Sequence, residues 1–145
     1  MSFDKQHIII LLDISYSMFS RKRQMLDGLN SFVKNLQKRS DSNSLFLSIM
    51  LFSEYTYYWC KSTPVSKVRR YHLSDFPAFG MTHLYDAILQ LTQDWFPVSN
   101  QAKHHLFIIT DGKDNGSKFT TKENQKKRDG DTEINSTRCQ NLSGR

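Results

Sequence analysis

The chain has 145 residues, a length that suits one domain with a modest hydrophobic core. It carries a net charge of +6, but its basic residues stand in separate small groups without an interleaved aromatic stripe, which argues against nucleic acid as a partner. The two cysteines, Cys60 and Cys139, are far apart and exclude a disulfide framework. No apolar stretch reaches the roughly 18 residues of a membrane span, and none resembles a signal peptide. We therefore expect a cytoplasmic location and no membrane partner.

The first half of the chain predicts a strand, a helix and a pair of strands. Residues 7–12 form a continuous apolar run, which is typical of a strand buried on both faces in a parallel sheet. From residue 21 to residue 39, apolar side chains recur at intervals of three and four, which predicts an amphipathic helix. Residues 45–52 and 55–60 are expected to be strands. The short connection between them, Ser53-Glu54, favours an antiparallel hairpin.

The second half predicts one more helix and one more strand. Residues 65–79 are ambiguous and suggest a short helix and a loop. Residues 82–96 have a helical pattern, and Thr82 can serve as the N-cap of that helix. Residues 106–110 are continuously apolar and predict the last strand. The order of strand, helix, strand pair, helix and strand indicates an α/β fold.

Side chains that carry oxygen stand beside the expected strand ends at three places. Asp13, Ser15 and Ser17 follow the first strand, Thr82 lies in a loop, and Asp111 follows the last strand. The carboxyl ends of parallel strands meet at one edge of a sheet, where ligands bind. An oxygen-only set selects a hard cation such as Mg²⁺, with Mn²⁺ or Ca²⁺ as alternatives. Since two carboxylates only balance a divalent ion, the ion would stay electrophilic towards a carboxylate from a partner.

Each of these residues also has an ordinary structural explanation. Asp13 could cap the end of a strand, Thr82 could be only an N-cap, and Asp111 could be only a turn residue. All three motifs in this order favour a site over three coincidences. Of the residues nearby, His83 could approach the site, but we expect it at the surface of the helix start; Asp86 either bonds towards the site or faces solvent.

The three motifs resemble those of von Willebrand factor A (vWA) domains with a metal-ion-dependent adhesion site. In that family the first motif is Asp-x-Ser-x-Ser, which Asp13, Ser15 and Ser17 match. The second is a threonine in a Gly-x-Thr loop, matched by Thr82, and the third is the aspartate of Thr-Asp-Gly, matched by Asp111. The resemblance implies that the hydroxyl groups bind the ion directly and that the aspartates often bind it through water.

The resemblance covers residues 5–122. Residues 80–87 are especially close to the family's Gly-x-Thr-x-Leu-Tyr-Asp-Ala form, and residues 108–115 resemble small stand-alone members of bacterial type. The implied fold is Rossmann-like, with a mostly parallel central sheet and helices on both faces. The family continues after Thr-Asp-Gly with further helix–strand units. Because residues 123–145 lack the apolar side chains for them, we expect these units to be missing and the tail to be disordered.

The sequence thus favours a non-enzymatic, Mg²⁺-dependent module that binds an aspartate or glutamate carboxylate of a protein partner. One alternative is a metal-dependent hydrolase or phosphoryl-transfer enzyme, in which Asp13 would be the only plausible nucleophile. Another is a polyanion binder, whose affinity would fall steeply with salt and would not depend on metal. A third is a truncated, non-functional fragment.

Overall fold

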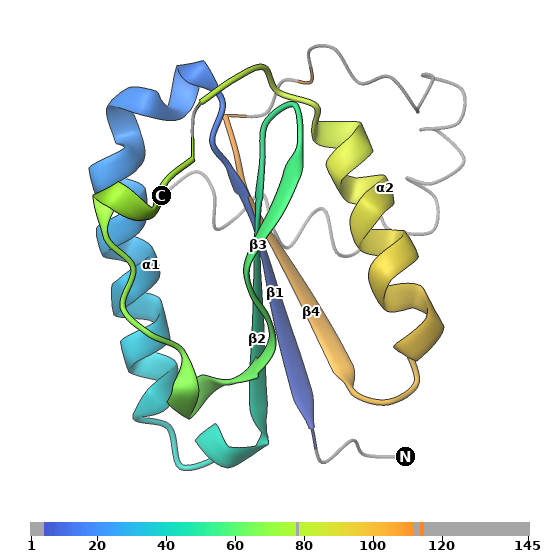
Figure 1. The fold of residues 1–145 in the computed structure, drawn as a ribbon. Coiled ribbons are helices and arrows are strands. Elements are labelled where there is room, and N and C mark those ends of the chain that lie inside the picture. Colours follow the sequence, from blue (N-terminus) through green and yellow to red (C-terminus); the bar gives the residue numbers. More distant parts are fainter. Residues whose placement is uncertain (1–4, 78, 112–113, 115–145) are drawn as a thin grey trace.

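The computed structural model of the chain describes residues 5–77, 79–111 and 114. Over these residues it is an α/β fold with four strands in one sheet, as predicted (Figure 1). The strands are β1 (Gln6–Asp13), β2 (Leu45–Phe52), β3 (Thr56–Pro64) and β4 (Lys103–Ile109). The helices are α1 (Lys22–Gln37) and α2 (Leu84–Trp95), joined by the short 3-10 helices η1 (Tyr16–Arg21), η2 (Ser42–Ser44), η3 (Val65–Lys67), η4 (Leu73–Asp75) and η5 (Phe96–Val98).

The sheet has the strand order β3-β2-β1-β4 and is mostly parallel. β1 pairs in parallel with both β2 and β4, whereas β3 pairs antiparallel with β2, which confirms the predicted hairpin. Two boundaries differ from the sequence-based expectation. β3 continues to Pro64 through irregular pairing with β2, and β4 begins at Lys103 rather than at Leu106.

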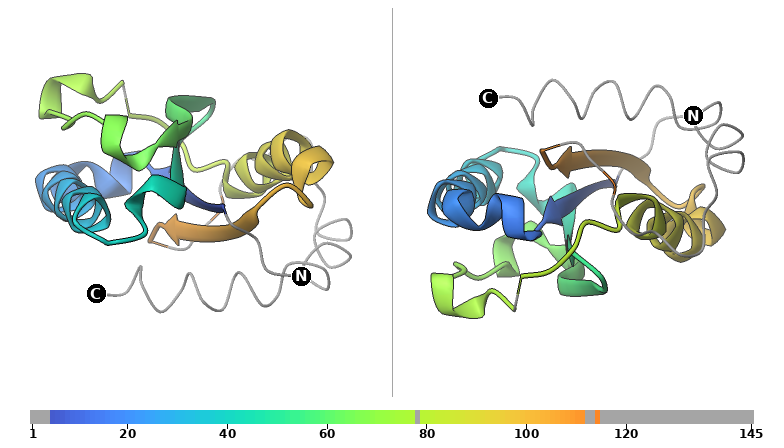
Figure 2. Two further views of the ribbon diagram at one scale, coloured as in Figure 1. Left: turned by 90° about the horizontal axis from the view of Figure 1, so that it is seen from below. Right: turned by 90° about the horizontal axis from the view of Figure 1, so that it is seen from above.

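The two long helices cover opposite faces of the sheet (Figure 2). Alternate residues of each buried strand therefore point into two different cores. The core beneath α1 holds Ile8, Ile10, Leu12, Leu47, Ile49 and Leu51. The core beneath α2 holds Ile9, Leu11, Met50, Phe52, Ala87 and Leu91. Each fully buried Leu, Ile, Met or Phe side chain stabilises the fold by about 1.5–3 kcal/mol relative to exposure. This double burial explains why the strand sequences are continuously apolar.

The segment from residue 65 to residue 79, for which the sequence suggested a short helix and a loop, contains the two 3-10 turns η3 and η4. It is anchored by aromatic contacts instead. The ring of Tyr71 stacks on that of Trp59 with centroids 4.4 Å apart, and the ring of Phe76 meets Trp59 edge-on at 5.1 Å. The segment therefore lies against β3 and α1 rather than standing free.

The chain connectivity places a topological switch point at β1. The α1 connection leads from β1 to its neighbour β2, and the α2 connection leads to β4 on the other side of β1. The two connections therefore run over opposite faces of the sheet, and open α/β sheets bind ligands at the carboxyl ends of the strands beside such a switch point.

No helix in the described part of the chain is both long and apolar enough to cross a membrane. The predicted domain limit at residue 122, the expected absence of later helix–strand units and the predicted disorder of residues 123–145 lie outside the described residues.

Candidate metal centre

Asp13 is the last residue of β1 and is completely buried, with 0% of its surface exposed. One carboxylate oxygen accepts the Ser15 backbone N–H at 2.8 Å, and the other accepts the Thr110 hydroxyl at 2.7 Å. A buried carboxylate is costly unless hydrogen-bonded, and these two donors both stabilise it and fix its orientation. Thr110 belongs to the Thr-Asp-Gly motif but was not among the predicted site residues. The loop after β4 thus reaches the end of β1.

The loop after Asp13 brings two hydroxyl groups together. Ser15 is buried and Ser17 is exposed, yet their Oγ atoms lie 3.0 Å apart. This separation suits the hydrogen bond seen here. It also fits neighbouring ligands of an octahedral Mg²⁺, which at metal–oxygen distances of 2.0–2.1 Å are about 3 Å apart. The predicted i, i+2 spacing therefore does aim both oxygens at one place.

The loop that carries Thr82 is joined to the serine loop through its backbone. Ser15 and Gly80 form an isolated parallel bridge, and the Tyr16 N–H donates to the Gly80 carbonyl at 2.9 Å. Thr82, two residues later, is 3% exposed. The structure thus brings the second motif alongside the first.

The prediction that Thr82 is the N-cap of α2 is wrong. The helix begins at Leu84, its N-cap residue is His83, and the His83 side chain makes no capping hydrogen bond. The reason is tertiary, because the bridge at Gly80 and a hydrogen bond from the His83 N–H to the Ser53 carbonyl, 3.0 Å long, keep this loop extended.

The expectation that His83 lies at the surface is also wrong, since only 5% of it is exposed. Its Nδ1 lies 3.8 Å from an oxygen of Asp86, whose side chain is 15% exposed. Asp86 therefore turns towards His83 rather than towards open solvent.

Asp111 follows Thr110 directly and is exposed. A second aspartate of the same loop, Asp114, accepts the Tyr85 backbone N–H at 3.1 Å. That N–H belongs to the first turn of α2, where backbone donors have no partner within the helix. The loop after β4 thus contacts both β1 and the start of α2. No local sequence pattern marks the role of Asp114, because its partner lies 29 residues earlier.

Glu54, in the hairpin between β2 and β3, also approaches this edge. A Cβ atom on Gly80 would lie 3.0 Å from Glu54 Oε1, so the carboxylate occupies the space that the glycine leaves. The same oxygen is 3.4 Å from the Met81 backbone nitrogen, which donates to it. The sequence suggested only a tight turn at Glu54, and its place beside the second motif follows from the sheet order.

The donors assembled here are hydroxyl and carboxylate oxygens. In the part of the chain that the structure describes, no group of three or more His, Cys, Asp or Glu side chains is arranged to hold a metal ion. An ion at the end of β1 would therefore depend on hydroxyl oxygens supported by Asp13 and Asp111. Such a set fits a hard cation and leaves part of its charge uncompensated.

No family model and no curated protein matches this sequence. Several solved structures do match its fold. One is the ArnB paralog VWA2 from Sulfolobus acidocaldarius, with 21% identity and a TM-score of 0.60 over 82% of this chain and 30% of that one. Another is the vWF domain of the type V pili tip protein Mfa5 from Porphyromonas gingivalis, with 15% identity and a TM-score of 0.63 over 82% and 43% of the two chains.

A third structure is proximal thread matrix protein 1 from the mussel byssus, with 14% identity and a TM-score of 0.56 over 90% of this chain and 34% of that one. This chain thus spans less than half the length of each structure. At these identities the matches establish the fold, and the fold is vWA-like, as the motifs predicted.

Proposed function

We propose that the chain is a divalent-cation-dependent module that binds an acidic group of a protein partner. Ser15, Ser17 and Thr82 would hold the ion through their hydroxyl oxygens, and Asp13 and Asp111 would bind it directly or through water. The proposal depends on one observation: Asp13, Ser15, Ser17 and the Thr110 hydroxyl are joined by hydrogen bonds at the carboxyl end of β1.

Charge explains how such a site would capture a partner. An Mg²⁺ ion among neutral hydroxyls and two carboxylates keeps exchangeable positions and electrophilic character. A carboxylate from an aspartate or glutamate of the partner would then complete its coordination. Mn²⁺ and Ca²⁺ prefer the same type of oxygen ligand and are the alternative ions.

The comparisons support a binding role rather than an enzymatic one. Among the proteins with this fold are a pilus tip protein and a byssus thread matrix protein, both named for structural assemblies. The cytoplasmic location stays a prediction from the sequence.

The test compares two double variants with the same spacing. Ser15→Ala/Ser17→Ala should abolish Mg²⁺ binding in titration calorimetry while leaving the circular dichroism spectrum unchanged. Ser42→Ala/Ser44→Ala changes an i, i+2 pair just before the amino end of β2, at the opposite end of the strands from the candidate site. This variant should bind Mg²⁺ like the unmodified chain. Equal Mg²⁺ affinity in the two double variants would rule out this assignment.

The second step uses the partner. Proteins captured on the immobilised chain in Mg²⁺ should be released by EDTA and recaptured when Mg²⁺ is restored. Capture that ignores EDTA but falls steeply with salt would favour the polyanion alternative. Mg²⁺-dependent phosphatase activity that disappears in Asp13→Asn would favour the enzymatic one.

A further inference from the structure

We propose that a pocket beside α1 binds an oxyanion, the carboxylate or phosphate group of a ligand, through Arg23 and Arg70. The pocket has a volume of about 350 Å³ and lies between the start of α1 and residues 70–74. Its basic side chains are Arg23, Arg70 and His72, and its only acidic one is Asp27. This site is separate from the proposed metal centre and does not depend on it.

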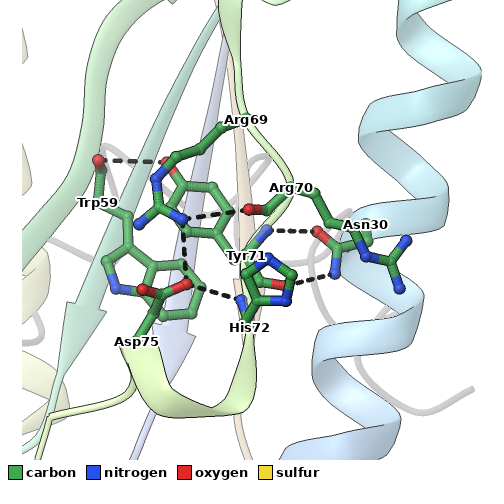
Figure 3. Close-up of polar contacts among 7 residues, drawn as sticks. All are labelled: Asn30, Trp59, Arg69, Arg70, Tyr71, His72 and Asp75. Carbon is green, nitrogen blue, oxygen red and sulfur yellow. Dashed lines mark hydrogen bonds and ion pairs between the residues drawn. The ribbon is translucent and has the colours of Figure 1, made fainter.

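The wall formed by residues 70–74 is held rigidly against α1. The Asn30 side chain donates to the Tyr71 carbonyl at 2.9 Å and accepts the Tyr71 N–H at 3.0 Å (Figure 3). The Tyr71 ring is stacked on Trp59, and its hydroxyl donates to the Trp59 carbonyl at 3.2 Å. The backbone next to Arg70 is therefore fixed before any ligand arrives, which lowers the ordering cost of binding.

Arg70 lines the pocket, whereas its neighbour Arg69 does not, and the two arginines have different roles. Arg69 pairs with Asp75 at 3.0 Å and also donates to the Arg70 carbonyl at 3.1 Å. Asp75 accepts the His72 N–H as well, at 2.7 Å. The hydrogen bond from Arg69, and then the one from the His72 N–H, lower the pKa of Asp75. This carboxylate therefore stays charged and remains paired with Arg69. Figure 3 shows the Arg70 side chain extending towards α1, away from the Arg69–Asp75 pair.

The charge at the pocket mouth is unbalanced. Among the described residues, neither Arg23 nor Arg70 forms an ion pair within 4.0 Å. Asp27 lies one helical turn beyond Arg23 and offers one negative charge against two guanidinium groups. A bound oxyanion would compensate the remaining charge, and the planar guanidinium fork suits both carboxylate and phosphate oxygens. Because both arginines are exposed, the binding should weaken as salt increases.

The experiment titrates the whole chain at pH 7 with inorganic phosphate in one arm and acetate in the other, at constant ionic strength. Amide chemical shifts of residues 70–74 report binding. We expect saturable shifts, an at least tenfold higher Kd in Arg23→Ala/Arg70→Ala, and a lower Kd in Asp27→Asn, which removes the competing carboxylate. The arm with the lower Kd identifies the preferred oxyanion.

The matched control is Lys34→Ala/Lys38→Ala, which removes the same charge from exposed positions near the end of α1. Its Kd should equal that of the unmodified chain. The proposal is overturned if the control weakens binding as much as the arginine variant, or if no shift saturates in either arm. Should the arginine variant fail to fold, an unchanged or higher Kd in Asp27→Asn would overturn the proposal independently.

Discussion

At the residue scale, a chain of hydrogen bonds assigns the tautomers of two histidines at the amino ends of β1 and β4. His104 Nε2 lies 3.1 Å from the Val98 carbonyl and must donate, so in the neutral ring Nδ1 accepts. His7 Nδ1, 2.9 Å away, then carries the proton, and His7 Nε2 accepts the Ser48 hydroxyl at 2.7 Å. Ser48 in turn accepts the Ser62 N–H at 2.7 Å. With these tautomers every member of the chain has a hydrogen-bond partner.

We expect the free energy of unfolding to fall as the pH is lowered from about 6.5 to about 4. Burial, and then the neighbouring His104, lower the pKa of His7 from 6.5 to about 4. Between those values the unfolded chain takes up a proton that the folded chain does not, so acid favours unfolding. Urea unfolding at pH 7 and pH 5 measures the loss, which should shrink in His7→Gln. His72→Gln, at an exposed position, is the control. Between pH 7 and pH 5 its free energy of unfolding should fall by as much as that of the unmodified chain.

Single residues of the candidate site were predictable where their geometry is local. Asp13, Ser15 and Ser17 lie within five positions, and the short loop alone brings their oxygens together. Thr110 and Glu54 were missed because they reach the site only through the order of the strands. No local pattern records that order.

At the element scale, too, the features set by local sequence were predictable and those set by tertiary contacts were not. β1, β2 and α1 were predicted from apolar runs and periodicity, since burial on the sheet faces determines both. The start of β4 was missed because His104 looks polar in sequence, although it pairs with His7 across the ladder. The start of α2 was misplaced because the bridge between Gly80 and Ser15 overrides the capping preference of Thr82.

Among the described residues, Asn30 is the α1 side chain that hydrogen-bonds to residues 69–75, and it makes two such bonds with the Tyr71 backbone. We expect Asn30→Ala to lower the free energy of unfolding by about 1–3 kcal/mol, because the backbone N–H and carbonyl of the buried Tyr71 lose their partners. Hydrogen exchange in residues 69–75 should also become faster. Asn35→Ala, at an exposed position of the same helix, should change stability by less than about 0.5 kcal/mol. Equal losses in the two variants would show that the Asn30 contacts contribute nothing.

At the scale of the whole molecule, the candidate metal centre exists only when the sheet is assembled. Its motifs lie at residues 13–17, 80–82 and 110–111, and they meet because β4 pairs with β1 and because Gly80 pairs with Ser15. Unfolding would separate them completely. A cation that binds all three loops must therefore favour the folded chain over the unfolded one.

We accordingly expect Mg²⁺ to raise the thermal unfolding midpoint. At a free concentration about 100 times the Kd, binding to the folded state alone stabilises by about 2.7 kcal/mol. Each kilocalorie per mole shifts the midpoint of a domain near 100 residues by about 4–8 °C. Because the chain carries a net charge of +6, NaCl of equal ionic strength must serve as the reference for non-specific salt effects. Ser15→Ala/Ser17→Ala should lose the Mg²⁺ effect and Ser42→Ala/Ser44→Ala should keep it. A midpoint that saturating Mg²⁺ raises no further than NaCl does would mean that the loops meet without forming a cation site.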